Sequence, residues 1–367
     1  MRATGPALEA GVADTSSLPP DLPDLSDLHL PVSALDLAPV VTGSTAAEAL
    51  GRTLDLAQRL DELGYHRLWV AEHHNLRGVA SSAPAVLIGH LAERTRHLRV
   101  GSGGVMLPNH APLVVAEQFG MLEALHPGRI DLGIGRAPGT DPVTARALRR
   151  TPGTLSADDF PEQLIDLLGF FTGQFEEGNP MAAITAVPAL GNLPAVWLLG
   201  SSGFSAQVAG LLGLPFAFAH HFSPDNTLPA LALYRQRFRP SDVLQEPYAM
   251  VAAGVLCAPT DEEAERLAGP TRLSFVRMRT NQPSTLPTQE EADRHEYTPL
   301  EQELLHRHRM SNIVGGPDRV RERLAVLLRE TAAQELMVTT TTYRPEDRVR
   351  SFELVAELFG LRSPSTA

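Results

Sequence analysis

The residues most able to do chemistry in this chain begin with the run Glu72-His73-His74-Asn75. An imidazole titrates near neutral pH, so it can accept and donate protons, and a neighbouring carboxylate or amide can orient it. Adjacent residues of an extended chain point to opposite sides, so His73 and His74 cannot easily bind one metal ion together. From its spacing alone, the run indicates a catalytic acid–base, a metal site or an ordinary polar loop.

Two glycine-rich stretches, residues 101–104 and 133–136, each follow an apolar run. Glycine permits the backbone to approach a flat or anionic ligand closely, although it also occurs at bulges and tight bends. The glycines of GIGRAPG do not have the spacing of a dinucleotide fingerprint. Arg136, which lies within the second stretch, can bind phosphate or carboxylate through two hydrogen bonds, or it can form a surface salt bridge.

A third group, GSSGFS at residues 200–205, separates an apolar run from a helical pattern. The first turn of a helix offers free N–H groups and a favourable dipole, and serine hydroxyls add further donors. Ser202 or Ser205 can equally serve as a simple helix N-cap. Together with Arg136, the group predicts an anion site, and phosphate is the simplest shared ligand. His220 and His221 follow the next apolar run and are expected at the same mouth.

The elements that position these residues alternate regularly between strand and helix. Apolar, β-branched runs predict a short strand followed by a loop within residues 30–40, and strands at residues 66–71, 97–103, 129–135, 195–199, 215–219, 248–256 and 336–341. Helical spacing appears at residues 44–63, 83–96, 112–125, 157–170, 204–212, 227–238, from 261 onward, and at 320–330. Eight alternations with polar residues at the strand ends predict a (β/α)8 TIM barrel with insertions and a site at its C-terminal face.

Composition limits the classes of function. The 31 basic and 43 acidic residues give a net charge of −12, which disfavours nucleic acid and anionic membranes as partners. The lone cysteine, Cys257, excludes an internal disulfide and a zinc–cysteine cluster. No apolar run has transmembrane length, and the start shows no signal-peptide pattern, so we expect a cytoplasmic protein.

Two segments depart from the alternation. Residues 1–29 are rich in Pro, Asp and Ser, which predicts a disordered or surface-draped tail before a single barrel domain over residues 30–367. Residues 277–311 are polar and long for a connection, which favours a lid over the site, with a plain surface insertion as the alternative.

Five segments in this order resemble the bacterial luciferase-like family of flavin-dependent monooxygenases, and within it the mensacarcin-pathway branch. They are LDLAPV, GYHRLWVAEHHN, RVGSGGVMLPNHAPLVVAEQF, LHPGRIDLGIGRAPGTD and GSSGFSAQVAGLLGLPFAFAHHF. The resemblance covers about residues 30–359. It implies a TIM barrel that holds reduced FMN, or in some branches F420, at its C-terminal face.

The resemblance also implies roles for single residues. His73 matches the active-site histidine beside the flavin, with Glu72 or Asn75 as its orienting partner. Gly103 and Gly104 match a bulged pair, often joined by a non-proline cis peptide, that supports the flavin ring, and Leu35 lies near the ring. Residues matching the phosphate site are Arg136, Ser201, Ser202, Gly203 and Ser205. No residue matches a metal ligand.

The expected function is therefore flavin-dependent monooxygenation of an organic substrate by O2, with a polyketide-type intermediate of secondary metabolism, in antibiotic biosynthesis, as the substrate class. No second nucleotide fingerprint is evident, so we expect a separate NAD(P)H-dependent reductase to supply reduced FMN, and a homodimer. Gly135 stands where luciferase alpha subunits carry a reactive cysteine, so light emission and an aldehyde substrate do not transfer. The alternatives are an F420-dependent oxidoreductase, a non-catalytic flavin-binding protein and a TIM-barrel metal hydrolase.

Overall fold

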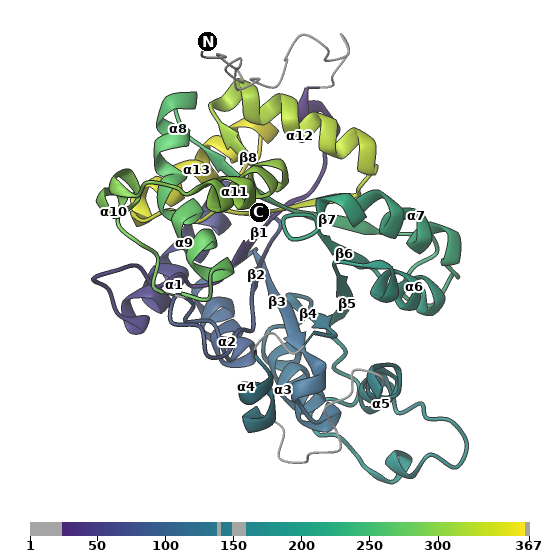
Figure 1. The fold of residues 1–367 in the computed structure, drawn as a ribbon. Coiled ribbons are helices and arrows are strands. Elements are labelled where there is room, and N and C mark those ends of the chain that lie inside the picture. Colours follow the sequence, from purple (N-terminus) through teal and green to yellow (C-terminus); the bar gives the residue numbers. More distant parts are fainter. Residues whose placement is uncertain (1–23, 138–140, 149–158, 283, 364–367) are drawn as a thin grey trace, which may run out of the picture.

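A closed parallel barrel organises the computed structural model, which describes residues 24–137, 141–148, 159–282 and 284–363 (Figure 1). Within this described part, eight strands close in the order β1-β2-β3-β4-β5-β6-β7-β9, because β6 pairs with β7 and β9 pairs with both β7 and β1. They are β1 (Val32–Asp36), β2 (Arg67–Val70), β3 (Arg99–Met106), β4 (Ile130–Gly135), β5 (Ala195–Gly200), β6 (Phe216–Ala219), β7 (Ala249–Cys257) and β9 (Glu335–Thr339). The TIM barrel predicted from the sequence is confirmed.

The strands read as continuous apolar runs because both of their faces are covered. Every residue of β2, β4 and β7 is buried, one face against the barrel interior and the other against surrounding helices. The helices that follow the strands are α1 (Ala46–Leu63), α2 (Pro84–Arg94), α3 (Pro112–Leu125), α5 (Phe160–Thr172), α6 (Gly203–Leu212), α7 (Thr227–Arg237), α12 (Pro317–Thr331) and α13 (Pro345–Phe359). All except α13 lie where the sequence predicted a helix.

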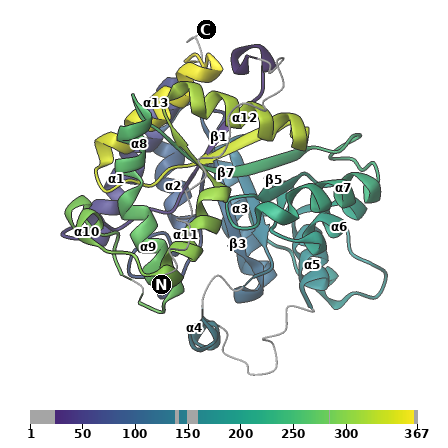
Figure 2. The ribbon, with the colours of Figure 1, turned by 45° about the horizontal axis from the view of Figure 1, so that its top comes forward.

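The largest addition follows β7, on the C-terminal face. It contains α8 (Asp261–Leu267), α9 (Gly269–Arg279), α10 (Gln289–Arg294) and α11 (Pro299–Ser311), and Figures 1 and 2 both show α9, α10 and α11 side by side. A smaller addition, α4 (Pro142–Leu148), follows β4. Residues 277–311, which we predicted as a polar lid, thus form the end of α9 together with α10 and α11.

A ninth strand, β8 (Asn312–Gly315), lies outside the closed barrel and was not predicted. It pairs with β7 from Gly254 onward, whereas β9 pairs with β7 up to Gly254. Gly254 therefore has Thr339 as its partner in β9 and Asn312 as its partner in β8. A Cβ atom at Gly254 would overlap the side-chain oxygen of Asn312, so β8 can begin there because residue 254 is a glycine. Strand β7 thus forks into β9 and β8.

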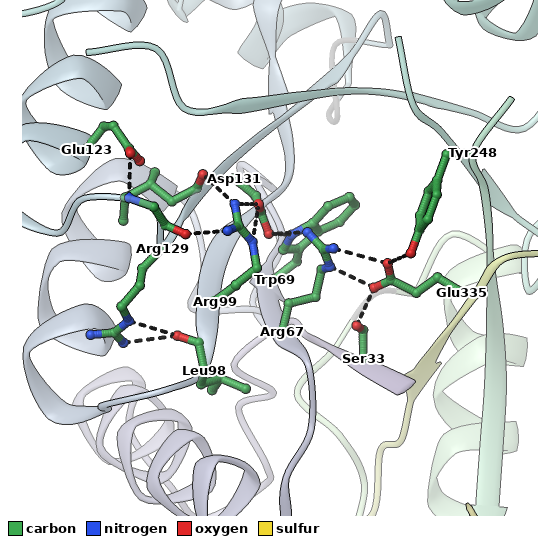
Figure 3. A network of polar contacts seen from close by, with 12 residues as sticks. Ser33, Arg67, Trp69, Leu98, Arg99, Glu123, Arg129, Asp131, Tyr248 and Glu335 are labelled. Atoms are coloured by element: carbon green, nitrogen blue, oxygen red, sulfur yellow. Dashed lines mark hydrogen bonds and ion pairs between the residues drawn. The ribbon is translucent and has the colours of Figure 1, made fainter. Parts of the chain in front are cut away.

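Buried charges fill the N-terminal end of the barrel interior (Figure 3). Arg67 is 2.7 Å from Asp131 and 2.7 Å from Glu335, and Asp131 also pairs with Arg99 at 2.6 Å. The hydroxyl groups of Ser33 and Tyr248 donate to Glu335, and the Trp69 indole donates to Asp131. Two arginines and two carboxylates are thereby paired and hydrogen-bonded, as buried charges require.

An apolar layer lies above these charges. It consists of Leu35, Trp69, Trp197, Ala217, Met250, Ala252 and Met337. The rings of Trp69 and Trp197 pack edge to face with centroids 5.3 Å apart. Charged and apolar side chains thus fill the N-terminal end and the middle of the barrel interior. Space for a ligand therefore remains at the C-terminal end.

Before β1, Leu25–Leu28 forms a short 3₁₀ helix (η2), with Leu25 buried beside α13. Residues 1–23 of the predicted tail lie outside the described residues. Among the described helices, none is both long and apolar enough to span a membrane.

Candidate active site

Two cavities open at the C-terminal ends of the strands. The first, here called the loop cavity, has a volume of about 220 Å³ and reaches from Leu35 and Gly103 to residues 201–205. The second, called the helix cavity, has a volume of about 590 Å³ and is covered by side chains of α9 and α11. They share four lining residues, Leu35, Gly103, His221 and Phe222. The two cavities therefore form one continuous cleft.

The loop cavity brings together four of the residues predicted to bind phosphate. Arg136, Ser201, Ser202 and Ser205 all line it, although they come from the ends of β4 and β5 and from the first turn of α6. Gly203 does not line the cavity but is the first residue of α6. Ser202 is the N-cap of α6, and its hydroxyl makes no capping hydrogen bond. The first turn of α6 thus keeps N–H groups that an anion can bind.

Arg136 has no carboxylate partner in the part of the chain that the structure describes, and its guanidinium contacts an aromatic ring. Its guanidinium carbon lies 4.2 Å from the centre of the Phe204 ring. A cation–π contact holds the side chain while leaving its N–H donors available. The surface salt bridge that the sequence left open for Arg136 is not what the structure shows.

Gly103 forms the floor where the two cavities meet. A Cβ atom on Gly103 would lie 2.9 Å from Leu35 Cδ1 and 3.1 Å from Trp69 Cβ, so any side chain here would crowd the floor. The peptide bond between Gly103 and Gly104 is cis, as the family resemblance implied. Gly104 lines neither cavity, and its Cβ would lie 2.7 Å from the Gly133 carbonyl oxygen. Gly103 therefore faces the cleft and Gly104 packs against β4.

His73 lines the helix cavity together with Gly103, and its backbone N–H donates to the Ser81 carbonyl at 2.9 Å. Glu72 and Asn75, which we expected to orient the His73 imidazole, contact other side chains. Asn75 donates its side-chain amide to Asp141 at 3.0 Å. The Glu72 carboxylate lies 3.0 Å from His74 Nε2 and 2.9 Å from His110 Nε2.

Glu72 is fully buried and anchors the end of β2 to the segment after β3. It accepts hydrogen bonds from the Met106 backbone N–H and the Asn109 amide as well as contacting His74 and His110. Burial raises the pKa of Glu72, but hydrogen bonds from His110, His74 and Met106 outweigh it, so the pKa is lowered overall. Glu72 is thus ionised at neutral pH and holds the chain on either side of His73 in place.

His221 lines both cavities, so it lies where the loop cavity and the helix cavity meet. Its Nδ1 atom lies 2.9 Å from the Ala252 carbonyl oxygen. A carbonyl oxygen can only accept, so Nδ1 carries the proton and Nε2 of the neutral ring is an acceptor. Burial lowers the pKa of His221 to about 4, despite an opposing effect of the Ala252 carbonyl. His221 is therefore neutral at pH 7.

The histidines do not form a metal site in the described part of the chain. There, no group of three or more His, Cys, Asp or Glu side chains is arranged to hold a metal ion. Glu72 accounts for the position of His74, and His220 Nδ1 lies 2.9 Å from the Thr227 hydroxyl. The metal-hydrolase alternative would use His73, His74 and His220 as ligands, and these contacts account for two of them, His74 and His220, without a metal.

Similar proteins share this architecture along nearly the whole chain. YvbT of Bacillus subtilis is 53% identical over 89% of this chain and 96% of its own length. A luciferase-like monooxygenase of Escherichia coli K12 is 46% identical over 91% of this chain and 98% of its own. The crystal structure of apo-MsnO8 superposes with a TM-score of 0.81 at 39% identity, covering 91% of this chain and 98% of that one.

More distant structures share the fold with different cofactors. The oxygenating constituent of 3,6-diketocamphane monooxygenase from Pseudomonas putida, in complex with FMN, is 20% identical with a TM-score of 0.70 and covers 90% of this chain and 97% of that one. An F420-dependent secondary alcohol dehydrogenase is 12% identical with a TM-score of 0.61 and covers 90% and 99%. The family model for luciferase-like monooxygenases matches residues 32–335. This chain is therefore an enzyme that belongs to the luciferase-like monooxygenase family.

Proposed function

We propose that this enzyme uses reduced FMN to place one oxygen atom of O2 on an organic substrate. The observation that carries the proposal is the continuity of the cleft through Leu35 and Gly103. At one end lies a helix N-terminus with serine hydroxyls and Arg136, and at the other a larger chamber that contains His73. A long ligand with an anionic end and a flat reactive end fits such a cleft.

The residues of the loop cavity fit FMN in two respects. Arg136 and the hydroxyl groups of Ser201, Ser202 and Ser205 supply donors for a phosphate dianion, in a chain that is otherwise acidic. Gly103 leaves room for a flat ring beside Leu35, where any side chain would be too close to the wall. We assign the phosphate to the α6 end and the ring to the Gly103 floor.

When bound, reduced FMN supplies the electrons and the reaction with O2, and the protein supplies position, proton transfer and exclusion of water. His73 lies at the substrate side of Gly103, where a neutral imidazole can take up or return a proton. His221 accepts a hydrogen bond through Nε2 from a donor on the cofactor or the substrate, since its Nδ1 proton is held by Ala252.

The helix cavity is the proposed substrate chamber. Leu37, Phe222, Phe275 and Met278 give it apolar walls, which support an extended organic substrate such as a polyketide-type intermediate. The predicted lid, residues 277–311, supplies Arg279, His306 and His308 to its lining from α9 and α11. We propose that these helices restrict the access of water to the chamber.

Two partners complete the proposal. A separate NAD(P)H-dependent reductase would supply reduced FMN, which is testable by adding a purified flavin reductase to the assay. A homodimer is supported by Val114, Met121 and Leu125, which form an exposed apolar stripe along α3, and light scattering would measure the mass.

The decisive experiment combines cofactor binding with isotope labelling. Anaerobic titration with reduced FMN and reduced F420 compares their affinities, and turnover under ¹⁸O2 follows one labelled oxygen atom into the product. Preferential binding of F420 with hydride transfer would establish the F420-dependent alternative. Binding of FMN without labelled product from any polyketide-type substrate would support a non-catalytic flavin-binding protein.

A further inference from the structure

A third cavity lies beside the helix cavity, in the fork where β8 and β9 part from β7. This arginine cavity has a volume of about 490 Å³ and is enclosed by α8, α9, α11 and α12 together with the ends of β7, β8 and β9. Four arginines line it, namely Arg272, Arg309, Arg319 and Arg323. Glu265 is the one acidic residue among the described residues that line it.

The charges in the arginine cavity do not cancel. Arg272 pairs with Glu265 at 2.6 Å, and Arg319 pairs with Asp261 at 2.8 Å. Arg309 and Arg323 have no carboxylate partner in the described part of the chain. Two positive charges thus stay uncompensated in a protein whose net charge is −12. Positive charge gathered in a cavity favours an anionic ligand.

Neighbouring groups respond to this positive charge. Burial, followed by the charges of Arg272 and Arg309, lowers the pKa of His308 to about 4. Burial and the charge of Arg319 lower the pKa of Arg323. Holding these positive charges close together therefore costs free energy, and an anion bound between them would offset that cost.

The arginine cavity is continuous with the proposed substrate chamber. It shares five lining residues with the helix cavity, namely Thr271, His308, Asn312, Thr339 and Thr341. Its remaining walls include the apolar residues Val255, Leu256, Ile313 and Val314. A single molecule can thus have an anionic end among the arginines and an apolar body that reaches toward Gly103.

We propose that the substrate is an organic acid whose carboxylate binds in the arginine cavity, at Arg309 and Arg323, while its reacting part lies in the helix cavity. This inference rests on the proposed monooxygenase function and specifies its substrate class. A carboxylate is the anion we choose because it matches the planar guanidinium in a bidentate contact.

The test uses three probes with the same apolar tail: octanoate, octyl phosphate and octanamide. Isothermal titration calorimetry measures their binding to the full chain, both without cofactor and loaded with FMN. The variants are Arg309→Gln and Arg323→Gln. Arg321→Gln is the matched control, because Arg321 lies on the same helix as Arg323 but pairs with Asp318 and lines no described cavity.

We expect octanoate to bind at least tenfold more tightly than octanamide, and each cavity variant to lose about tenfold of that affinity while the control keeps it. Octanoate should also change the absorbance spectrum of bound FMN, because the cavities are continuous. Equal affinity for octanoate and octanamide, or an equal loss in Arg321→Gln, would overturn the proposal. Octanoate binding that leaves the flavin spectrum unchanged would overturn the link to the substrate chamber.

Two further outcomes separate this inference from the proposed function. If octyl phosphate binds tenfold more tightly than octanoate, or Arg323→Gln weakens FMN binding, the cavity takes a phosphate and the carboxylate assignment is wrong. If the protein fails to bind FMN but the octanoate pattern persists without cofactor, the anion site stands and the FMN proposal falls.

Discussion

The Arg136 guanidinium lies over the Phe204 ring, with the guanidinium carbon 4.2 Å from the ring centre. The two residues come from different βα segments, after β4 and at the start of α6. Phe204 is 37% exposed, so the contact lies near the surface rather than in the core. The contact orients Arg136 without neutralising its charge, which suits the anion-binding role that we propose for it.

Removal of Arg136 should weaken FMN binding. We expect Arg136→Ala to cost about 1.5–3 kcal/mol of binding free energy, the usual contribution of a hydrogen bond to a charged group. Fluorescence titration with FMN measures the change. Arg94→Ala is the control, because Arg94 is exposed at the end of α2. Unchanged FMN affinity in Arg136→Ala would remove this residue from the phosphate site.

A side chain at Gly103 should weaken FMN binding more than it destabilises the fold. The Cβ of Gly103→Ala would lie 2.9 Å from the far end of the Leu35 side chain, which can shift, so we expect a small change in the melting temperature. The added methyl group and the shifted Leu35 would take space where we place the flavin ring, so we expect weaker FMN binding.

Gly104 provides the contrast. The family resemblance gives Gly104 the same supporting role as Gly103, which predicts that Gly104→Val impairs flavin binding more than folding. Its Cβ would lie 2.7 Å from the backbone oxygen of Gly133, which cannot move without disturbing β4, so we now expect a loss of folded protein. Circular dichroism and FMN titration of both variants separate the two effects, and equal FMN affinity in folded Gly103→Ala would contradict the floor assignment.

His73 should matter for turnover and not for cofactor binding. The residues that we assign to the phosphate follow β4 and β5 or lie in the first turn of α6, so His73→Ala should bind FMN nearly as well as the parent. Turnover should fall by roughly 10²–10⁴, the usual span for a general acid–base. Stopped-flow mixing with O2 and product analysis give the rate, with the exposed His90→Ala as the control. A parental rate in His73→Ala would mean that the histidine is structural.

The pH dependence of stability should report His221. Its pKa is about 4 in the folded protein because of burial, against about 6.5 in an unfolded chain. Between these values the unfolded chain binds a proton that the folded chain excludes, so stability decreases as the pH falls from 6.5 to 4. The loss approaches about 1.4 kcal/mol per pH unit at most.

Urea unfolding at several pH values tests this. His221→Asn keeps an N–H donor for Ala252 but does not titrate, so its stability should fall less steeply with acid than that of the parent. His308 also has a pKa of about 4 and contributes to the parent's slope, which His308→Asn would show separately. Identical slopes for the parent and His221→Asn would mean that folding does not change the pKa of His221.

Limited proteolysis tests the lid. Trypsin should cut first between residues 277 and 311, because this addition packs on the face of the barrel and not within it. FMN should slow the cleavage if the helices close over the cleft. Equal cleavage rates with and without FMN would leave α10 and α11 as a surface addition.

The strands of the barrel could be predicted because each is a run of apolar residues bounded by turn residues, and local pattern alone determines such an element. Strand β8 could not be, since only Ile313 and Val314 of its four residues are apolar, and the segment is a strand through its pairing with β7. Helices α10 and α11 escaped prediction because their sequences are polar, and each begins at a threonine–glutamate capping box within a stretch we considered as loop.

The candidate site was partly predictable for a similar reason. Arg136 and Ser202 each follow a strand, Gly103 lies near the end of one, and the barrel fold brings such ends together. The fork at Gly254 was not predictable, because it depends on a contact with Asn312, 58 residues away, and the arginine cavity follows from that fork. The different surroundings of Gly103, which faces the cleft, and Gly104, which packs against β4, also could not be predicted, because they depend on contacts with other strands.

The buried charges at the closed end of the barrel constrain how this sequence can change. Arg67, Asp131 and Glu335 come from three strands, and loss of one of them would leave a charge without its partner, at a cost of about 3–5 kcal/mol. Replacing these charged residues by uncharged ones would therefore require several substitutions at the same time, which rarely happens in evolution by single mutations. In the cleft at the opposite end, Trp69 shares this constraint because it donates to Asp131. Lining residues on α9, such as Phe275 and Met278, belong to a separate addition, so new substrate ranges can be selected there one residue at a time.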